Sequence, residues 1–453
     1  MSRRKVVILL LSVFTICAAL LVSMIGKPGS PITPTGDGTP SDQQPQLEGG
    51  ENREDAALSV AVSMDDSEYQ YWIKSIEQFQ QSHSQISITL TNIGDEDPDE
   101  ARKKASEAGE PFDIMLLDND RVREFAMQGY LLPVDEIVTG DSAADQLEAL
   151  TAMVKWNGSL WGVPLDSNPL LTVWSKKLLK AAGVNEPPQN LAELKSVLTA
   201  LSEAKPGSIS PFNLNTADAR DLSAWLGMFR DQTTAAANLI PFSADMKLQL
   251  HFAAEHAGEL TRFNPLQQQA DLLHAFQADR LLSAVLPWTI YQSLSSEERD
   301  LLTVGSMNGP LVRSNGRSFV LTAETERFSE AKEWIQEMTS TDAQLDRYHV
   351  FGRLPARISA LTGEFVYNDI SDRPPHYIVR MLQLAAAETD PSWRERWVRW
   401  SKLCESLGGN GTVFLPTVAD RLISEWNGEP EKDKNGAEAP SPTTLKADSQ
   451  PND

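Results

Sequence analysis

The chain beyond residue 57 alternates between short apolar runs and amphipathic segments. At 58–62 and 86–90 apolar residues recur at every second position, which predicts strands with one buried face. Between them, at 72–79, apolar residues recur at helical spacing. The run Ile114–Leu117 is apolar throughout, which is typical of a strand buried on both faces. Strands that alternate with helices predict a parallel α/β sheet.

The middle and the end of the chain carry further elements of both kinds. Two apolar arms around Asn157-Gly158 predict a β-hairpin within 154–164. Tryptophans at 393, 397 and 400 recur at helical spacing, which predicts a buried helix face. The other strands are expected at 170–174, 281–286 and 318–321, and the other helices at 191–201, 219–230, 246–260 and 266–278.

The N-terminal end predicts a membrane-spanning helix. Basic residues at 3–5 precede Val6–Gly26, which contains no charge. As a helix this stretch spans roughly 31 Å, about the thickness of a bilayer core. The basic cluster favours a cytoplasmic start, so the rest of the chain is expected on the extracellular face of the membrane. A cleaved signal peptide at 1–26 is the alternative, in which case the body is secreted.

Two further segments lack any apolar period. Residues 27–57 and 427–453 are rich in Pro, Gly and acidic or amide side chains. Such composition cannot bury enough apolar surface to offset chain entropy, so we expect a flexible acidic linker and a disordered tail. The folded body is therefore expected between Leu58 and Trp426.

Composition narrows the classes of function. The 453 residues carry 63 acidic and 40 basic side chains, a net charge of −23, which argues against a nucleic-acid partner. Only Cys17 and Cys404 occur, so a disulfide framework and a multi-cysteine metal site are excluded. The six histidines match no metal-binding motif, and no phosphate loop stands out. No catalytic residue, metal or cofactor is predicted.

Several segments together form a recognisable pattern. They are Pro111–Ile114 with Gly129–Asp135, Trp156–Pro164 followed by Ser175–Leu179, Ala284–Trp288 and Gly352–Arg357. In this order they resemble the bacterial family 1 extracellular solute-binding proteins, the capture subunits of carbohydrate importers, including maltose-binding members. The resemblance covers nearly all of the body. It departs at Trp174–Lys176, where the family has Tyr-Asn-Lys, and in the absence of a lipid-attachment motif around Cys17.

The resemblance implies a fold and a function. The fold is an α/β, two-lobed periplasmic-binding-protein-like fold of type II, with a ligand cleft between the lobes. Motif order places one lobe at 58–165 plus 316–362 and the other at 166–315 plus 363–426. The implied function is capture of a carbohydrate, an oligosaccharide, by hinged closure of the lobes. A monomer would deliver this ligand to the permease subunits of an ABC importer.

The candidate ligand-binding residues are aspartates, arginines, an asparagine and tryptophans. Sugar hydroxyls suit carboxylates and arginine, because charge-assisted hydrogen bonds are strong, and the ring face suits tryptophan. Strand ends in α/β sheets are where ligands bind. The candidates are Asp65, Asp118, Asp120, Arg121, Asn168, Trp225, Trp288 and Arg353. The alternative roles are helix caps and surface ion pairs for the charged residues, and core packing for the tryptophans.

Two other functions are considered. A permanent anchor with a long linker also suits an accessory sensor that presents its ligand to a membrane histidine kinase. A carbohydrate-active enzyme is less favoured, because Asp118 and Asp120 are two residues apart in one loop. The carboxylates of a glycosidase pair need a defined separation of about 5–10 Å.

Overall fold

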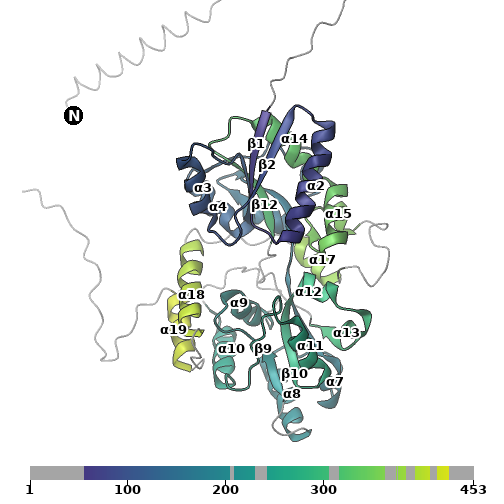
Figure 1. The fold of residues 1–453 in the computed structure, drawn as a ribbon. Helices are drawn as coiled ribbons and strands as arrows, with labels where there is room; N and C mark the ends of the chain where they lie inside the picture. The colour runs from purple at the N-terminus through teal and green to yellow at the C-terminus, as the bar shows by residue number, and fades with distance from the viewer. Residues whose placement is uncertain are drawn as a thin grey trace, which may run out of the picture. The chain divides into compact units, whose positions relative to one another are not determined.

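A computed structural model describes residues 56–204, 209–229, 242–305, 316–362, 374, 376–383, 393–408 and 416–427 (Figure 1). The predicted membrane helix, the linker and the tail lie outside the described residues. Among the described residues, no helix combines the length and the apolar character needed to cross a bilayer.

The larger sheet has seven strands, in the order β13-β7-β12-β3-β1-β2, with β4 paired to β12. Their bounds are β1 (Ala56–Val62), β2 (Ile86–Asn92), β3 (Ile114–Asp118), β4 (Leu131–Leu132), β7 (Val163–Ser167), β12 (Arg317–Thr322) and β13 (Leu354–Pro355). β1 is parallel to β2 and β3, as predicted. β12 runs antiparallel to β3, β4 and β7, so the expectation of a purely parallel sheet was wrong and the sheet is mixed.

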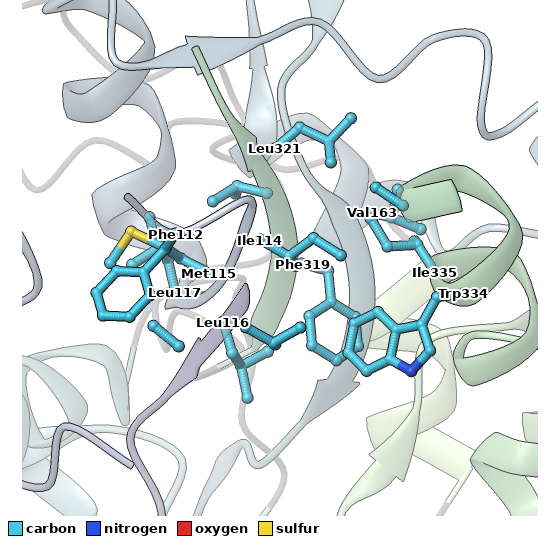
Figure 2. Packing of buried hydrophobic residues seen from close by; sticks show 14 of the residues in the cluster. Phe112, Ile114, Met115, Leu116, Leu117, Val163, Phe319, Leu321, Trp334 and Ile335 are labelled. Atoms are coloured by element: carbon cyan, nitrogen blue, oxygen red, sulfur yellow. The ribbon is translucent and has the colours of Figure 1, made fainter. Parts of the chain in front are cut away.

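Helices surround the larger sheet, and those that contribute to its core cluster bury the apolar faces of the sheet. They are α2 (Asp66–Ser82), α3 (Pro98–Glu107), α4 (Asn119–Met127), α5 (Asp141–Ala144), α6 (Glu148–Val154), α14 (Phe328–Met338), α15 (Thr341–Phe351), α16 (Ile358–Thr362) and α17 (His376–Gln383). The ring of Phe319 lies 5.5 Å from that of Trp72 and 4.9 Å from that of Trp334. Figure 2 shows Phe319 beside Trp334, with Phe112 and Met115 together apart from them. Residues 114–117 are buried, as their apolar run predicted.

The smaller sheet has the order β11-β8-β10-β9. Its strands are β8 (Leu170–Ser175), β9 (Ser210–Asn213), β10 (Leu281–Pro287) and β11 (Leu302–Val304). The helices of this part are α7 (Lys176–Ala181), α8 (Leu191–Ala204), α9 (Ala219–Gly227), α10 (Ala244–Glu255), α11 (Gln269–Gln277), α12 (Trp288–Ser293), α13 (Ser296–Asp300), α18 (Trp393–Gly408) and α19 (Pro416–Asn427). The predicted helices and strands are confirmed, with ends that differ by a few residues.

The helices near the C-terminal end of the body complete the core of the smaller sheet. α18 and α19 pack against each other, with α9 next to α18 and α10 next to α19. Trp397 and Trp400 are buried there with Trp426, which confirms the predicted buried helix face at these positions. The third tryptophan, at 393, has a side chain outside the described part.

Each sheet has a hydrophobic core of its own, which gives two lobes. The chain passes from β7 of the larger sheet to β8 of the smaller sheet through Asn168-Pro169. A separate cluster of buried side chains joins α6, α15, β13 and α17 to the first turn of α12. The predicted lobe boundaries stay a prediction, and in the structure α17 packs against α6 and α16.

The Asn157-Gly158 turn has the geometry that its sequence predicts. It joins β5 (Lys155–Trp156) to β6 (Ser159–Leu160), and φ is 50° at Asn157 and 85° at Gly158. Positive φ at both central positions is the mark of a type I′ turn, whose twist suits a two-residue hairpin. The confirmed hairpin follows directly after α6 and leads into β7.

Replacing Gly158 by alanine is expected to destabilise the protein by about 1–2 kcal/mol, because a Cβ is disfavoured at this φ. No atom lies within 4 Å of the added Cβ, so the loss comes from the backbone alone. Urea unfolding of the full-length chain measures it. The control is Gly258→Ala, where φ is not positive and the Cβ also meets open space; a change within about 0.5 kcal/mol is expected there. Equal losses in the two variants would contradict the turn assignment.

Candidate functional site

The ends of several strands meet at one edge of the larger sheet. The carboxyl ends of β1, β3 and β7 lie at the edge where β12 and β13 begin, because β12 is antiparallel to β3 and β13 is antiparallel to β7. Asp118 is the last residue of β3 and pairs in register with Arg317, the first residue of β12. Arg353 directly precedes β13. Charged residues from distant parts of the sequence are therefore gathered at this edge.

A buried ion-pair network occupies the centre of this edge. Arg317 donates through Nε and Nη2 to the Asp166 carboxylate, at 3.2 Å and 2.5 Å. Its Nη1 and Nη2 also donate to the two oxygens of Glu68, at 3.0 Å and 2.6 Å. Nε of Arg353 lies 3.0 Å from Oδ1 of Asp166. We call these four residues the edge network; Glu68, Asp166 and Arg317 are all buried.

The strand geometry explains why the network forms here. Asp166 pairs in register with Arg317 on one side and with Pro355 on the other, so its backbone is held between β12 and β13. The register of β12 against β7 shifts between Arg317 and Ser318, as in a β-bulge. Bulges occur often beside functional sites because they redirect a side chain. Glu68 enters from the first turn of α2.

The charges of Asp166 and Arg317 persist across the physiological pH range. Burial raises the pKa of Asp166, but the guanidinium groups of Arg317 and Arg353 outweigh burial and hold this pKa at about 2. Burial lowers the pKa of Arg317, and the carboxylates of Asp166 and Glu68 outweigh it, so the pKa lies above its ordinary value. Each charge is thus kept by a partner of opposite sign.

The sequence analysis missed Glu68, Asp166 and Arg317. A signal was present for two of them, since Arg317 stands in the otherwise uncharged strand RSFVLT and Asp166 in VPLDS. A charge inside an apolar strand needs a buried partner of opposite sign. The pattern indicates that such a partner exists without saying which residue supplies it.

Asp118 and Asp120 lie at the predicted strand end. Asp118 is half exposed, and its Oδ2 lies 3.5 Å from Nη2 of Arg220 in α9. Partial desolvation by the surrounding protein, and then the charge of Asp120, raise the pKa of Asp118. Nearby arginines oppose this rise, and they include Arg353 and Arg317. The charges of Asp120 and Arg353 therefore both act on Asp118, and the ligand roles of the three residues stay predictions.

Two other candidates, Asp65 and Arg121, have partners within the protein. Asp65 caps α2 by accepting a bond of 2.9 Å from the backbone N–H of Glu68. Arg121 pairs with Asp97 at 2.8 Å and with Glu124 at 3.1 Å. These are the cap and ion-pair roles weighed as alternatives, and the ligand roles of both residues stay predictions.

Asn168 lies in the segment that joins the two sheets. Its Nδ2 donates to Oγ1 of Thr289 at 3.1 Å, and its Oδ1 accepts from the Thr289 backbone N–H at 3.1 Å. Thr289 belongs to α12, which follows the smaller sheet. Asn168 thus fixes the crossing segment to α12, and its ligand role also stays a prediction.

The two candidate tryptophans lie in hydrophobic cores. Trp225 is 1% exposed, its ring lies 4.4 Å from that of Phe212, and its Nε1 donates to the Gln249 carbonyl at 3.3 Å. Trp288 is 2% exposed and packs near Tyr291, with ring centroids 6.1 Å apart. Neither indole presents a face to solvent here, and the role of each in stacking on a ligand stays a prediction. Their burial corresponds to the alternative of core packing.

Two other kinds of site, a metal site and a groove, are considered among the described residues. No group of three His, Cys, Asp or Glu side chains there is arranged to hold a metal ion. A groove of about 950 Å³ lies between α8, α10 and β9 of the smaller sheet, and none of the eight candidate residues lines it. The edge of the larger sheet therefore remains the place where the predicted ligand chemistry gathers.

Comparison with known proteins assigns the family. Residues 74–374, about two thirds of the chain, match the family described as bacterial extracellular solute-binding protein. The chain belongs to this family. The family is one of binding proteins, in agreement with the function predicted from the ordered segments.

One curated relative and several solved structures are similar to the chain. A stretch of 102 residues is 28% identical to the maltotriose-binding protein of Pyrococcus abyssi, and it spans 22% of this chain and only 21% of that relative. The sugar-binding protein MalE of Xanthomonas citri has a TM-score of 0.64 at 17% identity, over 82% of this chain and 97% of that one. The cyclic α-maltosyl-1,6-maltose-binding protein of Arthrobacter globiformis has a TM-score of 0.61 at 16% identity, over 82% and 98%. UgpB of Mycobacterium tuberculosis, solved with glycerophosphocholine, has a TM-score of 0.59 at 19% identity, over 82% of this chain and 98% of that one. These likenesses confirm the predicted two-lobed solute-binding-protein fold.

Proposed function

We propose that this solute-binding protein captures an oligosaccharide on the extracellular face of the membrane and delivers it to the permease subunits of an ABC importer. The observation that carries the proposal is the group Asp118, Asp120 and Arg353 at the sheet edge of a family member. The names of the maltotriose-binding and maltosyl-binding relatives support the carbohydrate class. Binding involves no covalent step and needs no cofactor.

The chemistry of the edge suits a neutral, hydroxyl-rich ligand. Asp118 and Asp120 accept hydrogen bonds from sugar hydroxyls, and Arg353 donates to ring or hydroxyl oxygens. Acceptors and a donor side by side match hydroxyl groups, which both give and receive hydrogen bonds. The phosphate group of the glycerophosphocholine bound by UgpB carries acceptors only, and this group would be repelled by the two carboxylates.

The hinge of the proposed capture step lies at the segment that joins the sheets. Asn168-Pro169 connects β7 to β8, and Asn168 is fixed to α12 through Thr289. Rotation about such a segment closes two lobes on a ligand when contacts form on both sides. Arg220 of α9 in the smaller-sheet lobe lies 3.5 Å from Asp118 of the larger-sheet lobe, so this pair connects the two lobes. The N-terminal helix predicted at 1–26 would tether the monomer to the membrane.

Calorimetry of the full-length chain against maltose, maltotriose, maltotetraose and glycerophosphocholine tests this function. One sugar site per chain is expected, and Asp118→Asn should weaken sugar binding by roughly tenfold, because the lost hydrogen bonds involve a charged acceptor. The matched control is Asp342→Asn, an exposed acid in the first turn of α15, which should leave the affinity unchanged. If no sugar binds by calorimetry or raises the melting temperature, the carbohydrate proposal fails. Tight binding of glycerophosphocholine alone would replace the ligand class.

A further inference from the structure

A buried carboxylate lies directly behind the proposed ligand residue Arg353. Oδ1 of Asp166 is 3.0 Å from Nε of Arg353, and the Arg353 side chain is 20% exposed whereas that of Asp166 is 7% exposed. A ligand at the sheet edge can therefore reach the arginine but not the aspartate. Building on the proposed function, we propose that Asp166 is a positioning residue that holds Arg353 in its ligand-binding orientation.

The rest of the edge network fixes Asp166 itself. Arg317 contacts both carboxylate oxygens of Asp166, and Glu68 in turn holds both terminal nitrogens of Arg317. The contacts run in the order Glu68, Arg317, Asp166, Arg353. They therefore link α2, through β12 and β7, to the partly exposed Arg353. Because Asp166 is also paired through its backbone with β12 and β13, the carboxylate has little freedom to turn.

This arrangement lowers the entropy lost on binding. A free arginine side chain has many rotamers, and ordering them on ligand binding opposes affinity. The ion pair with Asp166 already restricts Arg353 in the unliganded protein. Arg317 and Arg353 match the two carboxylates of the network in number, and the charge of buried Arg347 also acts on them, so Asp166 can hold Arg353 without an excess of buried negative charge.

A double-mutant cycle separates positioning from a general structural role. With maltotriose as the probe and the full-length chain in the calorimeter, Asp166→Asn should raise the Kd by roughly tenfold or more. In an Arg353→Ala background the same change should alter the Kd by less than about twofold, since there is no arginine left to position. Arg353→Lys should not restore the affinity, because lysine lacks the planar fork of donors.

Two controls guard against loss of the fold. Glu324→Gln disturbs another arginine–carboxylate pair of the same lobe, with Arg102 at 3.1 Å, and should leave the Kd unchanged. If Asp166→Asn does not fold, Glu68→Gln releases the network one contact further away and should weaken maltotriose binding only when Arg353 is present. A second readout is the crystal structure of unliganded Asp166→Asn, in which the Arg353 side chain should leave its position beside residue 166.

The possible failures are distinguishable. Wild-type protein that binds none of the probe sugars overturns the proposed function, and the role of Asp166 in binding falls with it. Wild-type protein that binds maltotriose overturns only the positioning role if Asp166→Asn has the same effect with and without Arg353. An Arg353 side chain that keeps its place in the unliganded Asp166→Asn crystal structure overturns the positioning role as well.

Discussion

Replacing Arg317 by alanine should destabilise the protein by about 3–5 kcal/mol, because it leaves buried carboxylates without their main partner. Arg317 is 7% exposed and holds Glu68 and Asp166 together through bidentate contacts. Urea unfolding of the full-length chain at pH 7 measures the change. The matched control is Arg399→Ala, whose side chain is 54% exposed and pairs with Glu425 at 3.0 Å. A surface pair of this kind contributes at most about 1 kcal/mol.

The loss on removing Arg317 should depend on pH. In the wild type the pKa of Asp166 is lowered to about 2, so its contribution is present above the unfolded value of 3.8 and is lost as the pH falls through about 2. Without Arg317 the pKa of Asp166 rises, because burial is then opposed only by the weaker remaining interactions with Arg353 and Arg347. The variant should therefore lose most stability near pH 7 and less near pH 4. A loss below about 1 kcal/mol at pH 7 would contradict the buried network.

Replacing Trp400 by alanine should destabilise the protein by about 3–5 kcal/mol, the range for removal of a buried aromatic side chain. Trp400 is fully buried, and its ring lies 5.1 Å from that of Trp426 and 5.8 Å from that of Trp397. The expected loss follows from the packing of α18 and α19 into the smaller-sheet core. Urea unfolding measures it, again with Arg399→Ala as the control in the same helix. Equal and small changes in both variants would mean that α18 does not belong to this core.

The sequence predicted individual elements better than their directions. The spacing of apolar residues and the Asn157-Gly158 turn signal predicted β1, β3 and the hairpin correctly, because each of these elements depends on residues close together in the sequence. It did not predict that β12 runs antiparallel to β3. These two strands are separated by about 200 residues, and hydrophobic alternation is the same in a strand of either direction. Strand direction here depends on how the chain returns from the smaller sheet, which no local pattern encodes.

The site was predictable in part for the same reason. Asp118 and Asp120 follow a buried apolar run, so their place at a sheet edge could be read locally. The edge network could not be predicted locally, because Arg317 is separated from Asp166 by 151 positions in the sequence and from Glu68 by 249. The positions of Trp225 in a helix and of Trp288 at a strand end could not show whether each packs in a core or contacts a ligand, because a tryptophan suits both roles.

A crystal structure of the full-length chain grown with maltotriose tests the central claim most directly. The claim is that a sugar is held at the edge of the larger sheet where β3 ends and β13 begins. The expected result is a maltotriose with hydroxyl groups within hydrogen-bond distance of Asp118 and Arg353, and with Asp166 still paired to Arg353. A sugar seated elsewhere, or an edge that stays without sugar at saturating maltotriose, would contradict the account.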